Sequence, residues 1–458
     1  MSEVPGIERS IGIEVYASRT EGIGGVIKRS PEDFIVEEIL ADGLKASVKL
    51  ENNLTHVFAD HGRYLICILI KRGWDTLLAV EEISKAIGID SGRVGFAGIK
   101  DANALTAQYI SVGGVPASKL ADINIEGIVI KPLGYADEEV TPKRLLGNMF
   151  TIVVRSVRLV DEVIEDRIRR ICSELDDFGG VPNFFGHQRF GTIRPITHLV
   201  GKSILKGDFE SAVMTFLSYV SPFESAKASE VRRDLRESLD FKAALKKFPK
   251  TLFYERLILS HLSNAPRDYI GALHKLPQSF RKLFIQSYQS YLFNRFLSER
   301  IKRGIPLKEV QVGDYAVRLN SMGLPEKPFI EVKESNVAHV NKEIRMGRMA
   351  LALPLIGLRQ PPSKGLQGEI ESEILEEEGI SGEDFKRTKV LNVSVLGGLR
   401  VAMERVMNFE AKVIREIGRP LENSVEFKFI LHKGAYATIL LREFMKPRTD
   451  EELVKSGF

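Results

Sequence analysis

The residues best suited to chemistry lie between Gly95 and Tyr109. Two glycines there lead into Lys100 and Asp101, and glycine allows backbone torsions that other residues resist. A rigid turn of this kind can hold the Asp101 carboxylate toward a cleft, and the neighbouring Lys100 would favour its ionised form. The same residue types also make ordinary surface turns. From this stretch alone, a catalytic aspartate and a plain turn both stay open.

Regular structure is expected on both sides of this turn. Apolar residues at helical spacing over 77–87 predict a helix that is capped at Thr76 and closed by Gly88. The apolar run 54–70 predicts a strand region, and a rough alternation over 105–112 predicts a strand directly after the turn. The aspartate would therefore be held between predicted elements.

Patterns along the rest of the chain predict a change in character near residues 179–182, where two glycines precede a proline. Before this boundary the patterns predict β segments at 26–39, 128–130 and 141–155, and then an amphipathic helix over 160–175. Beyond it they predict helices at 199–205, 209–219, 226–247 and 278–301. The last part is predicted to hold a helix over 399–416 and a hairpin of strands 424–431 and 436–442.

Length and composition narrow the class of protein. A chain of 458 residues is too long for one core, so two or three domains are expected. It has no apolar run of the roughly 18 residues that a membrane span needs and no secretory signal, so we expect a cytoplasmic protein. Its two cysteines predict small core residues rather than a disulfide framework. A net charge of +4 permits nucleic-acid binding without demonstrating it.

Several well-known chemical motifs are missing from the sequence. It has no phosphate-binding loop of the Gly-x-x-x-x-Gly-Lys type and no dinucleotide-binding Gly-x-Gly-x-x-Gly that opens a helix. It has neither cysteine pairs with zinc spacing nor a Gly-x-Ser-x-Gly elbow. The chemistry left open is cofactor-free and metal-free, with acidic or basic side chains.

Five stretches, taken in order, resemble the signatures of the tRNA pseudouridine synthase D (TruD) family. They are Pro31-Glu32-Asp33-Phe34, Gly95 to Tyr109, Asn148-x-Phe150, Gly180 to Gly191 with Gly186-x-Gln188-Arg189, and Ser290-Tyr291-Leu292-Phe293-Asn294. Each is weak alone, but five in the right order are specific. The resemblance covers essentially the whole chain from Gly22 to Phe444.

The resemblance implies that the protein isomerises a uridine of tRNA, typically at position 13, to pseudouridine without a cofactor. The family's aspartate nucleophile matches Asp101. Its carboxylate helps to break the bond from C1′ to N1, either by attacking the sugar or by assisting a proton abstraction. The uracil then rotates and rejoins the sugar through C5. The sequence leaves both routes open.

Further site residues follow from the same resemblance. Lys28 matches the family's lysine and is expected to hold down the pKa of the nucleophile. Phe34, Asn148 and Phe150 match the pocket around the flipped base, and Tyr436 aligns with an aromatic residue near the C-terminus. Each position also has an ordinary alternative: a surface lysine, core phenylalanines, or a turn asparagine.

The sequence departs from the family pattern in three places. Tyr436 stands where bacterial relatives usually have phenylalanine, and it can still stack. Ala102 and Asn103 stand where relatives commonly have basic residues, so this turn is not expected to contact phosphates. The region from 180 to 404 is also longer than in bacterial members, which seldom have helices near 199–250.

Two other stretches are candidates for RNA contact. The loop holding Phe184 and Phe185 lies beside Arg189 and Arg194, and such mixtures can stack on single-stranded RNA. The same aromatics could instead pack a domain junction. Residues 231–256 hold eight lysines or arginines against four acids, which can contact phosphates or form a solvated face.

The expected fold is α+β. A pseudouridine synthase catalytic domain with a mixed, largely antiparallel sheet flanked by helices would comprise 1–180 and 405–458. A mostly helical α+β TRUD domain would be inserted between them at 181–404. The resemblance implies a V-shaped molecule whose cleft takes tRNA, with no membrane and no protein partner implied.

Two rival functions belong to other classes. An RNA-binding module with a degenerate site, acting on tRNA folding, is disfavoured because Lys28, Asp101, Asn148 and Phe150 are all present. A different RNA-modifying enzyme, such as a methyltransferase, is disfavoured by the missing glycine-rich nucleotide loop. Formation of pseudouridine in a tRNA transcript would separate the three.

Overall fold

The computed structural model describes residues 3–49, 58–121, 123–415 and 422–458. Part of the predicted strand region 54–70, namely 54–57, lies outside the described residues, as does residue 416 at the end of the predicted helix 399–416. In the described part of the chain, no helix is both long enough and apolar enough to cross a membrane.

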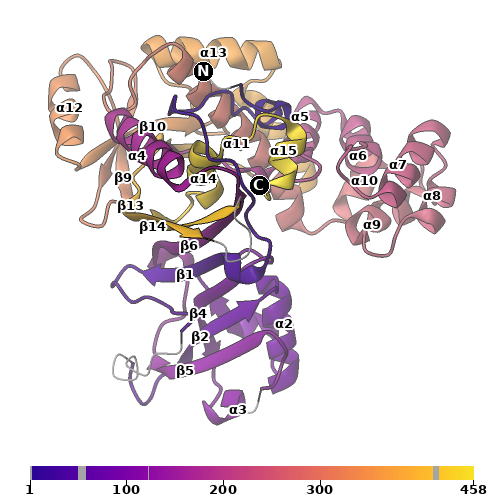
Figure 1. The fold of residues 1–458 in the computed structure, drawn as a ribbon. Coiled ribbons are helices and arrows are strands. Elements are labelled where there is room, and N and C mark those ends of the chain that lie inside the picture. The colour runs from indigo at the N-terminus through magenta and orange to yellow at the C-terminus, as the bar shows by residue number, and fades with distance from the viewer. Residues whose placement is uncertain (1–2, 50–57, 122, 416–421) are drawn as a thin grey trace.

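An eight-stranded sheet forms the centre of the molecule, in the order β13-β14-β6-β1-β4-β2-β5, with β3 paired to β4 (Figure 1). Only the pair β1 and β4 is parallel, and the other pairs are antiparallel. The predicted mixed, largely antiparallel sheet is therefore confirmed. Its strands are β1 Phe34–Leu40, β2 Tyr64–Arg72, β3 Val94–Phe96, β4 Leu105–Gly113, β5 Ile128–Ala136, β6 Leu145–Val157, β13 Met407–Arg415 and β14 Asn423–His432.

The central strands of this sheet are buried on both faces, because helices and loops pack against each side of it. Leu65, Cys67 and Leu69 of β2 share one hydrophobic cluster with the buried face of α2 Thr76–Ile87. Gly88 ends α2 in the left-handed conformation, as predicted, but Asp75 rather than Thr76 caps its start. The other helices of this part are α1 Gly6–Ser10, α3 Ser118–Ala121, α4 Asp161–Phe178, α14 Ala437–Met445 and α15 Asp450–Lys455.

The segment between residues 181 and 404 begins and ends at one place. Its first strand, β7 Val181–Pro182, pairs antiparallel with its last, β12 Met403–Glu404. Between them, four strands form a second sheet in the order β11-β10-β8-β9, from β8 Tyr315–Leu319, β9 Pro325–Glu331, β10 Met349–Leu355 and β11 Gly398–Val401. From these pairings we propose the division into 1–180, 181–404 and 405–458.

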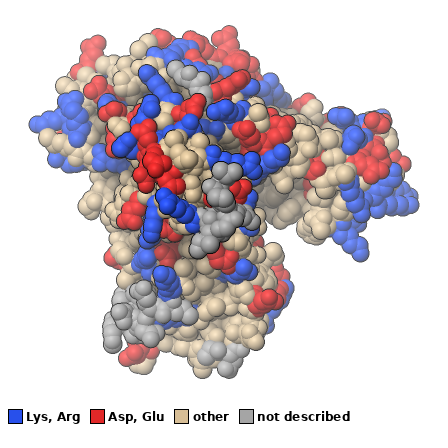
Figure 2. All heavy atoms as spheres, in the orientation of Figure 1, with Lys and Arg blue, Asp and Glu red and all other residues tan. Residues whose placement is uncertain are grey.

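Helices make up most of this middle segment. They are α5 Thr197–Lys206, α6 Phe209–Ser218, α7 Ala226–Ser238, α8 Phe241–Lys247, α9 Phe253–Leu262, α10 Tyr269–His274, α11 Gln278–Lys302, α12 Val337–Arg345 and α13 Gly365–Glu378. In Figure 1, α6 to α10 form an arm that extends to the right, while β2, β4 and β5 extend downward. Figure 2 shows an open angle between these two extensions on the same face.

Three predicted elements are wrong. The predicted helix 399–416 is instead β11, β12 and β13, whose backbone groups pair with β10, β7 and β14. The predicted strand 436–442 is the first part of α14. The predicted single helix 226–247 is two helices, because Leu239 takes a left-handed conformation (φ 52°) and Asp240 caps α8 through the amide of Ala243.

Candidate active site

The turn of residues 97–104, which we call the aspartate turn, connects β3 to β4. A buried lysine on β2 holds its backbone, since Lys71 Nζ donates to the carbonyl oxygens of Asp101 at 2.8 Å and Trp74 at 2.6 Å. Burial lowers the pKa of Lys71 to about 8, although the charge of Asp101 opposes that shift. The backbone of the aspartate turn is therefore held in place by the buried ammonium group of Lys71.

Lys100 does not play the predicted role of a cation beside Asp101. Its Nζ lies 2.6 Å from Oε1 of Glu38, and the two side chains are only 5% and 0% exposed. The other oxygen of Glu38 accepts the amide of Tyr109 at 2.9 Å, and the amide of Lys100 donates to Thr76 Oγ1 at 3.0 Å. Lys100 thus ties the aspartate turn to β1 and α2.

The cation beside Asp101 is Lys28. Its Nζ lies 2.5 Å from Asp101 Oδ2, and the two side chains are 12% and 16% exposed. Asp101 also accepts the amide of Asn103 at 3.0 Å and Nε2 of Gln188 at 2.7 Å. Burial alone would raise the pKa of Asp101, but the charge and hydrogen bond of Lys28, with the two amide donors, leave that pKa below its ordinary value of 3.8. The carboxylate is ionised at neutral pH.

The backbone of Lys28 is held in an unusual conformation. Its φ of 57° lies in the left-handed region, which a residue with a side chain adopts only at a cost. Lys28 follows a bridge between Val26 and Arg155 and precedes the turn Pro31–Asp33. Its Nζ also lies 4.7 Å from the centre of the Phe34 ring. This geometry directs the ammonium between Asp101 and an aromatic face.

A pocket of about 400 Å³ opens in front of the carboxylate. It brings together five of the six predicted site residues, since its walls include Phe34, Asp101, Asn148, Phe150 and Tyr436. The sixth, Lys28, reaches the pocket through its contacts with Asp101 and Phe34. Residues up to 400 positions apart in the chain therefore converge on one site.

The aromatic walls of the pocket are rigid. Phe34 and Phe150 meet edge to face with ring centres 6.3 Å apart, and Phe150 stacks on Phe429 at 5.4 Å. Both wall residues are at least nine-tenths buried and belong to the main hydrophobic cluster. They line the pocket and pack the core at once, so the two readings of these phenylalanines are compatible.

Asn148 contributes a polar atom without a partner. It lies on β6, opposite Glu38 of β1 and Leu431 of β14. Asn148 is one of the residues that line the pocket, and its Oδ1 is buried and accepts no hydrogen bond from any described residue. A buried carbonyl oxygen of this kind costs free energy unless a ligand supplies a donor. It is suited to accept an N–H group of a planar base.

Tyr436 stands at the start of α14, and its ring meets Phe185 edge to face at 6.3 Å. Gly186 allows this placement, because a Cβ at that position would lie 2.9 Å from Cδ1 of Tyr436. Ala437 and Thr438 of the same helix also line the pocket. The misassigned segment 436–442 therefore forms a wall of the site as a helix.

Sequence reasoning missed the roles of Gln188, Lys71 and Glu38. Gln188 belongs to the family motif Gly186-x-Gln188, but nothing in the sequence indicates that its side-chain amide contacts Asp101, 87 residues away. Lys71 and Glu38 are charged residues in strands whose other residues are mostly apolar, which is a signal of buried polar contacts.

The aromatic loop near Phe184 packs the junction rather than presenting rings to solvent. Phe184 is 1% and Phe185 is 9% exposed. Arg400 lies over the Phe185 ring, with its guanidinium carbon 4.1 Å from the centre. Arg194 donates to the carbonyl of Phe216 at 2.8 Å, inside the helical arm. The packing alternative is the one that the structure supports.

The arrangement is suited to acid-base or nucleophilic chemistry on a planar ligand. It combines an ionised, largely buried carboxylate, a paired ammonium, aromatic walls and a free amide oxygen. Within the residues that the structure describes, no group of three or more His, Cys, Asp or Glu side chains is placed to hold a metal ion.

Comparisons with known proteins place this chain in one family. The family model described as tRNA pseudouridine synthase D (TruD) matches residues 10–444. A relative in Methanococcoides burtonii, assigned by name to tRNA pseudouridine synthase D, is 37% identical over 97% of this chain and 98% of its own. A relative from Methanosarcina mazei with the same assignment is 38% identical over 97% of this chain and 98% of its own.

A solved structure agrees with both. The crystal structure of a protein from Methanosarcina mazei, assigned to TruD, superposes with a TM-score of 0.81 at 36% identity, covering 98% of this chain and 100% of that one. The α+β fold predicted from the sequence is thus found in a related solved structure. The chain belongs to the tRNA pseudouridine synthase D (TruD) family.

Proposed function

We propose that this protein isomerises uridine to pseudouridine in tRNA, at position 13, with Asp101 as the nucleophile and no cofactor. The observation that carries the proposal is the Asp101 carboxylate, paired with Lys28 at 2.5 Å, at the head of a pocket with aromatic walls. The family membership supports the tRNA substrate. A tRNA substrate also fits the expected cytoplasmic location.

The reaction needs no external oxidant or reductant. The bond from C1′ to N1 breaks, a bond from C1′ to C5 forms, the proton leaves C5, and N1 gains a proton. Asp101 can attack C1′ and be displaced when C5 returns, or it can assist removal of a sugar proton. Both routes require an ionised carboxylate, which Lys28 maintains.

The pocket suits a base that has left its stack. The faces of Phe34, Phe150 and Tyr436 can enclose a uracil ring, which must stay bound while it rotates. The buried Oδ1 of Asn148 can accept a hydrogen bond from a ring N–H of uracil, and this bond would give that oxygen the partner that it lacks. Gln188, from the middle segment, donates a hydrogen bond to Oδ2 of Asp101, the same oxygen that pairs with Lys28.

The direct test is to incubate the protein with unmodified tRNA transcripts and to map pseudouridine by chemical probing and primer extension. We expect one new pseudouridine at position 13 without added metal or cofactor. A product at another uridine would refute the position alone. A transcript set that gains no pseudouridine at all would refute the function.

A further inference from the structure

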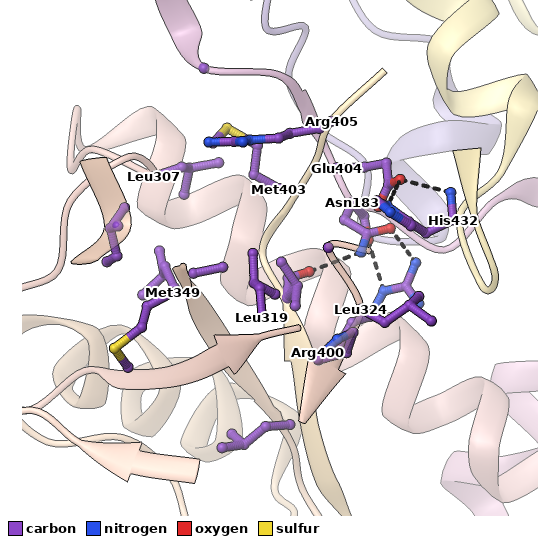
Figure 3. Close-up of a pocket in the computed structure, with 18 of the residues that line it drawn as sticks. Asn183, Leu307, Leu319, Leu324, Met349, Arg400, Met403, Glu404, Arg405 and His432 are labelled. Atoms are coloured by element: carbon purple, nitrogen blue, oxygen red, sulfur yellow. Dashed lines mark hydrogen bonds and ion pairs between the residues drawn. The ribbon is translucent and has the colours of Figure 1, made fainter. Parts of the chain in front are cut away.

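A second and larger cavity, of about 770 Å³, lies beside the candidate active site. None of the six proposed site residues lines it, and Figure 3 shows its walls. The two cavities share Lys433, and the segment 432–436 contributes residues to both. Arg400 of the larger cavity donates to the carbonyl of Gly434 at 2.8 Å and so holds this segment. The two cavities are neighbours across one short loop.

One part of this cavity is apolar. Leu307, Leu319, Met349 and Met403 gather there, from the loop that follows α11 and from strands β8, β10 and β12 (Figure 3). Leu307 and Met349 are at least nine-tenths buried by the surrounding protein. Apolar walls of this extent suit a ligand with a flat apolar face, and every nucleobase has two such faces.

The other part of the cavity is polar and positively charged. Six cationic side chains line the cavity against two carboxylates, Glu309 and Glu404, the cations being Arg189, Lys308, Arg345, Arg400, Arg405 and Lys433. Glu404 is engaged by the backbone amide and Nδ1 of His432, each at 2.9 Å. Arg405 is exposed and makes no ion pair or hydrogen bond with any described residue. The excess of positive charge favours an anionic ligand.

We propose that this cavity binds a second nucleotide of the tRNA substrate, which leaves the RNA stack together with the target uridine. Its base lies between the apolar walls, and its phosphate lies against the cationic side chains led by Arg405. The proposal rests on the proposed function, because it takes tRNA as the substrate. It adds a contact with a second base that the pocket around Asp101 does not provide.

A nucleotide of the same RNA fits better than a free one, because the larger cavity lies next to the pocket for the target uridine, across the segment 432–436. An RNA strand that places one nucleotide in front of Asp101 passes the segment 432–436, where Lys433 faces both cavities. A neighbouring nucleotide then meets the larger cavity without any further diffusion step, which raises its effective concentration.

The test removes single nucleobases from the tRNA within a few positions of the target and measures kcat/KM under single-turnover conditions. With the wild-type protein we expect one position at which loss of the base lowers kcat/KM about tenfold or more, the usual effect of losing one stacked base. In Leu319→Trp, which fills the apolar part, we expect intact tRNA to show that same reduction. In this variant, removal of the base from the tRNA should lower kcat/KM no further, because the substitution and the base removal both eliminate the same interaction.

The matched controls keep the cavity intact. Leu366→Trp, on the exposed surface of α13, should respond to base removal as the wild type does. Arg405→Ala should reduce the slope of log K against log salt for tRNA binding by the amount expected for about one lost phosphate contact. Arg318 is an exposed arginine on β8 outside the cavity, and Arg318→Ala should leave that slope unchanged.

Three outcomes would overturn the inference. They are a flat response to base removal, a Leu319→Trp variant that stays as sensitive as the wild type, and tight binding of free nucleoside monophosphates with a flat tRNA response. If the wild type forms no pseudouridine, the proposed function fails alone. The same base-removal series is then measured as tRNA affinity, which reports on the cavity without turnover.

Discussion

At the scale of the residue, the site depends on how Asp101 stays charged while it is buried. Its pocket would raise the pKa of the carboxyl group, and the ammonium of Lys28 at 2.5 Å reverses that effect. Lys28 also faces the Phe34 ring, so one side chain joins the Asp101 carboxylate to the aromatic wall. Removal of this ammonium should therefore change the chemistry more than the fold.

The first prediction concerns Lys28→Met. Without the ammonium, burial dominates and the pKa of Asp101 rises. Because the reaction needs the ionised form, the acidic limb of the kcat/KM profile should move to higher pH and the rate at pH 7 should fall. A pH profile from 4 to 8 measures this, with Arg29→Met, an exposed neighbour, as the control. An unmoved acidic limb would show that Lys28 does not set the ionisation of Asp101.

The lowered pKa of Asp101 also has a consequence for stability. A carboxyl group whose pKa is depressed by folding stabilises the protein above its unfolded value, near 3.8, and that contribution is lost as the pH falls through the folded pKa. Lys28→Met removes it. The difference in unfolding free energy between wild type and variant should thus be present at neutral pH. It should shrink as the pH falls through the raised pKa of Asp101 in the variant toward the depressed pKa in the wild type.

The second prediction concerns Asn148, whose buried oxygen has no partner among the described residues. Asn148→Leu should lower kcat/KM about tenfold, the effect of removing one hydrogen bond. Its stability should be unchanged or higher, because an unsatisfied buried acceptor is removed. Ser84→Ala is the matched control, since it removes a similar unpaired atom on α2. Equal activity of the Asn148 variant and the wild type would exclude a base contact.

At the scale of the element, the aspartate turn is fixed by a buried ion pair rather than by its glycines alone. Lys100 and Glu38 connect the turn to β1, and Thr76 connects it to α2. Removing one charge of a buried pair leaves the other without compensation. The position of the Asp101 carboxylate should therefore depend on the buried pair of Lys100 and Glu38.

The third prediction follows from this pair. Lys100→Met should lower the free energy of unfolding by roughly 3 to 5 kcal/mol, and Lys100→Met with Glu38→Gln should recover part of it. Urea unfolding measures the stability, and kcat reports the displacement of Asp101. The exposed pair of Lys247 and Asp234 at 2.7 Å is the control, because Lys247→Met should cost less than about 1 kcal/mol. Similar losses for both lysines would refute the anchoring role.

The elements that the sequence predicted well carry a clear local signal. α2 shows helical spacing and a glycine stop. β4 is buried on both faces, and its rough alternation together with the preceding turn was enough to identify it as a strand. α14 was missed because all nine of its residues are buried, and a short, largely apolar run can be read as a strand or as a buried helix. β13 does alternate apolar and polar residues from Met407 to Val413, and the predicted helix 399–416 overlooked this strand signal.

From the sequence, only the site residues that match the family could be predicted. Matched motifs singled out Asp101 and Lys28, and the structure brings these two side chains together. The partner of Lys100 could not be read from its neighbours in sequence, because Glu38 lies 62 residues away. Contacts between distant segments follow from the sheet order, which local sequence does not encode.

At the scale of the whole molecule, the helical arm carries a group of exposed basic residues. Of the eight basic residues in 231–256, Arg232 is buried against Glu224 and Glu255, and Arg256 donates to the carbonyls of Leu245 and Phe248. The other six are exposed, and Figure 2 shows Lys and Arg side chains gathered at the end of the arm. We expect these exposed residues to contact phosphates.

The fourth prediction tests this surface. Replacing Lys242, Lys246 and Lys250 together by alanine should weaken tRNA binding and reduce the slope of log K against log salt by about 0.7 to 0.9 for each phosphate that the protein no longer neutralises. The same three positions changed to arginine keep the charge and serve as the control. An unchanged slope in the alanine variant would show that these lysines form a solvated face and do not contact phosphates.

The most direct test of the whole account is single-turnover pseudouridine formation by Asp101→Asn on an unmodified tRNA transcript. We predict a loss of about 10⁴-fold or more in rate, with tRNA affinity within about twofold of the wild type, because the amide keeps the shape but cannot act as a nucleophile or base. Asp137→Asn, an exposed aspartate outside the pocket, should keep full activity. Pseudouridine formed by Asp101→Asn at the wild-type rate would contradict the account.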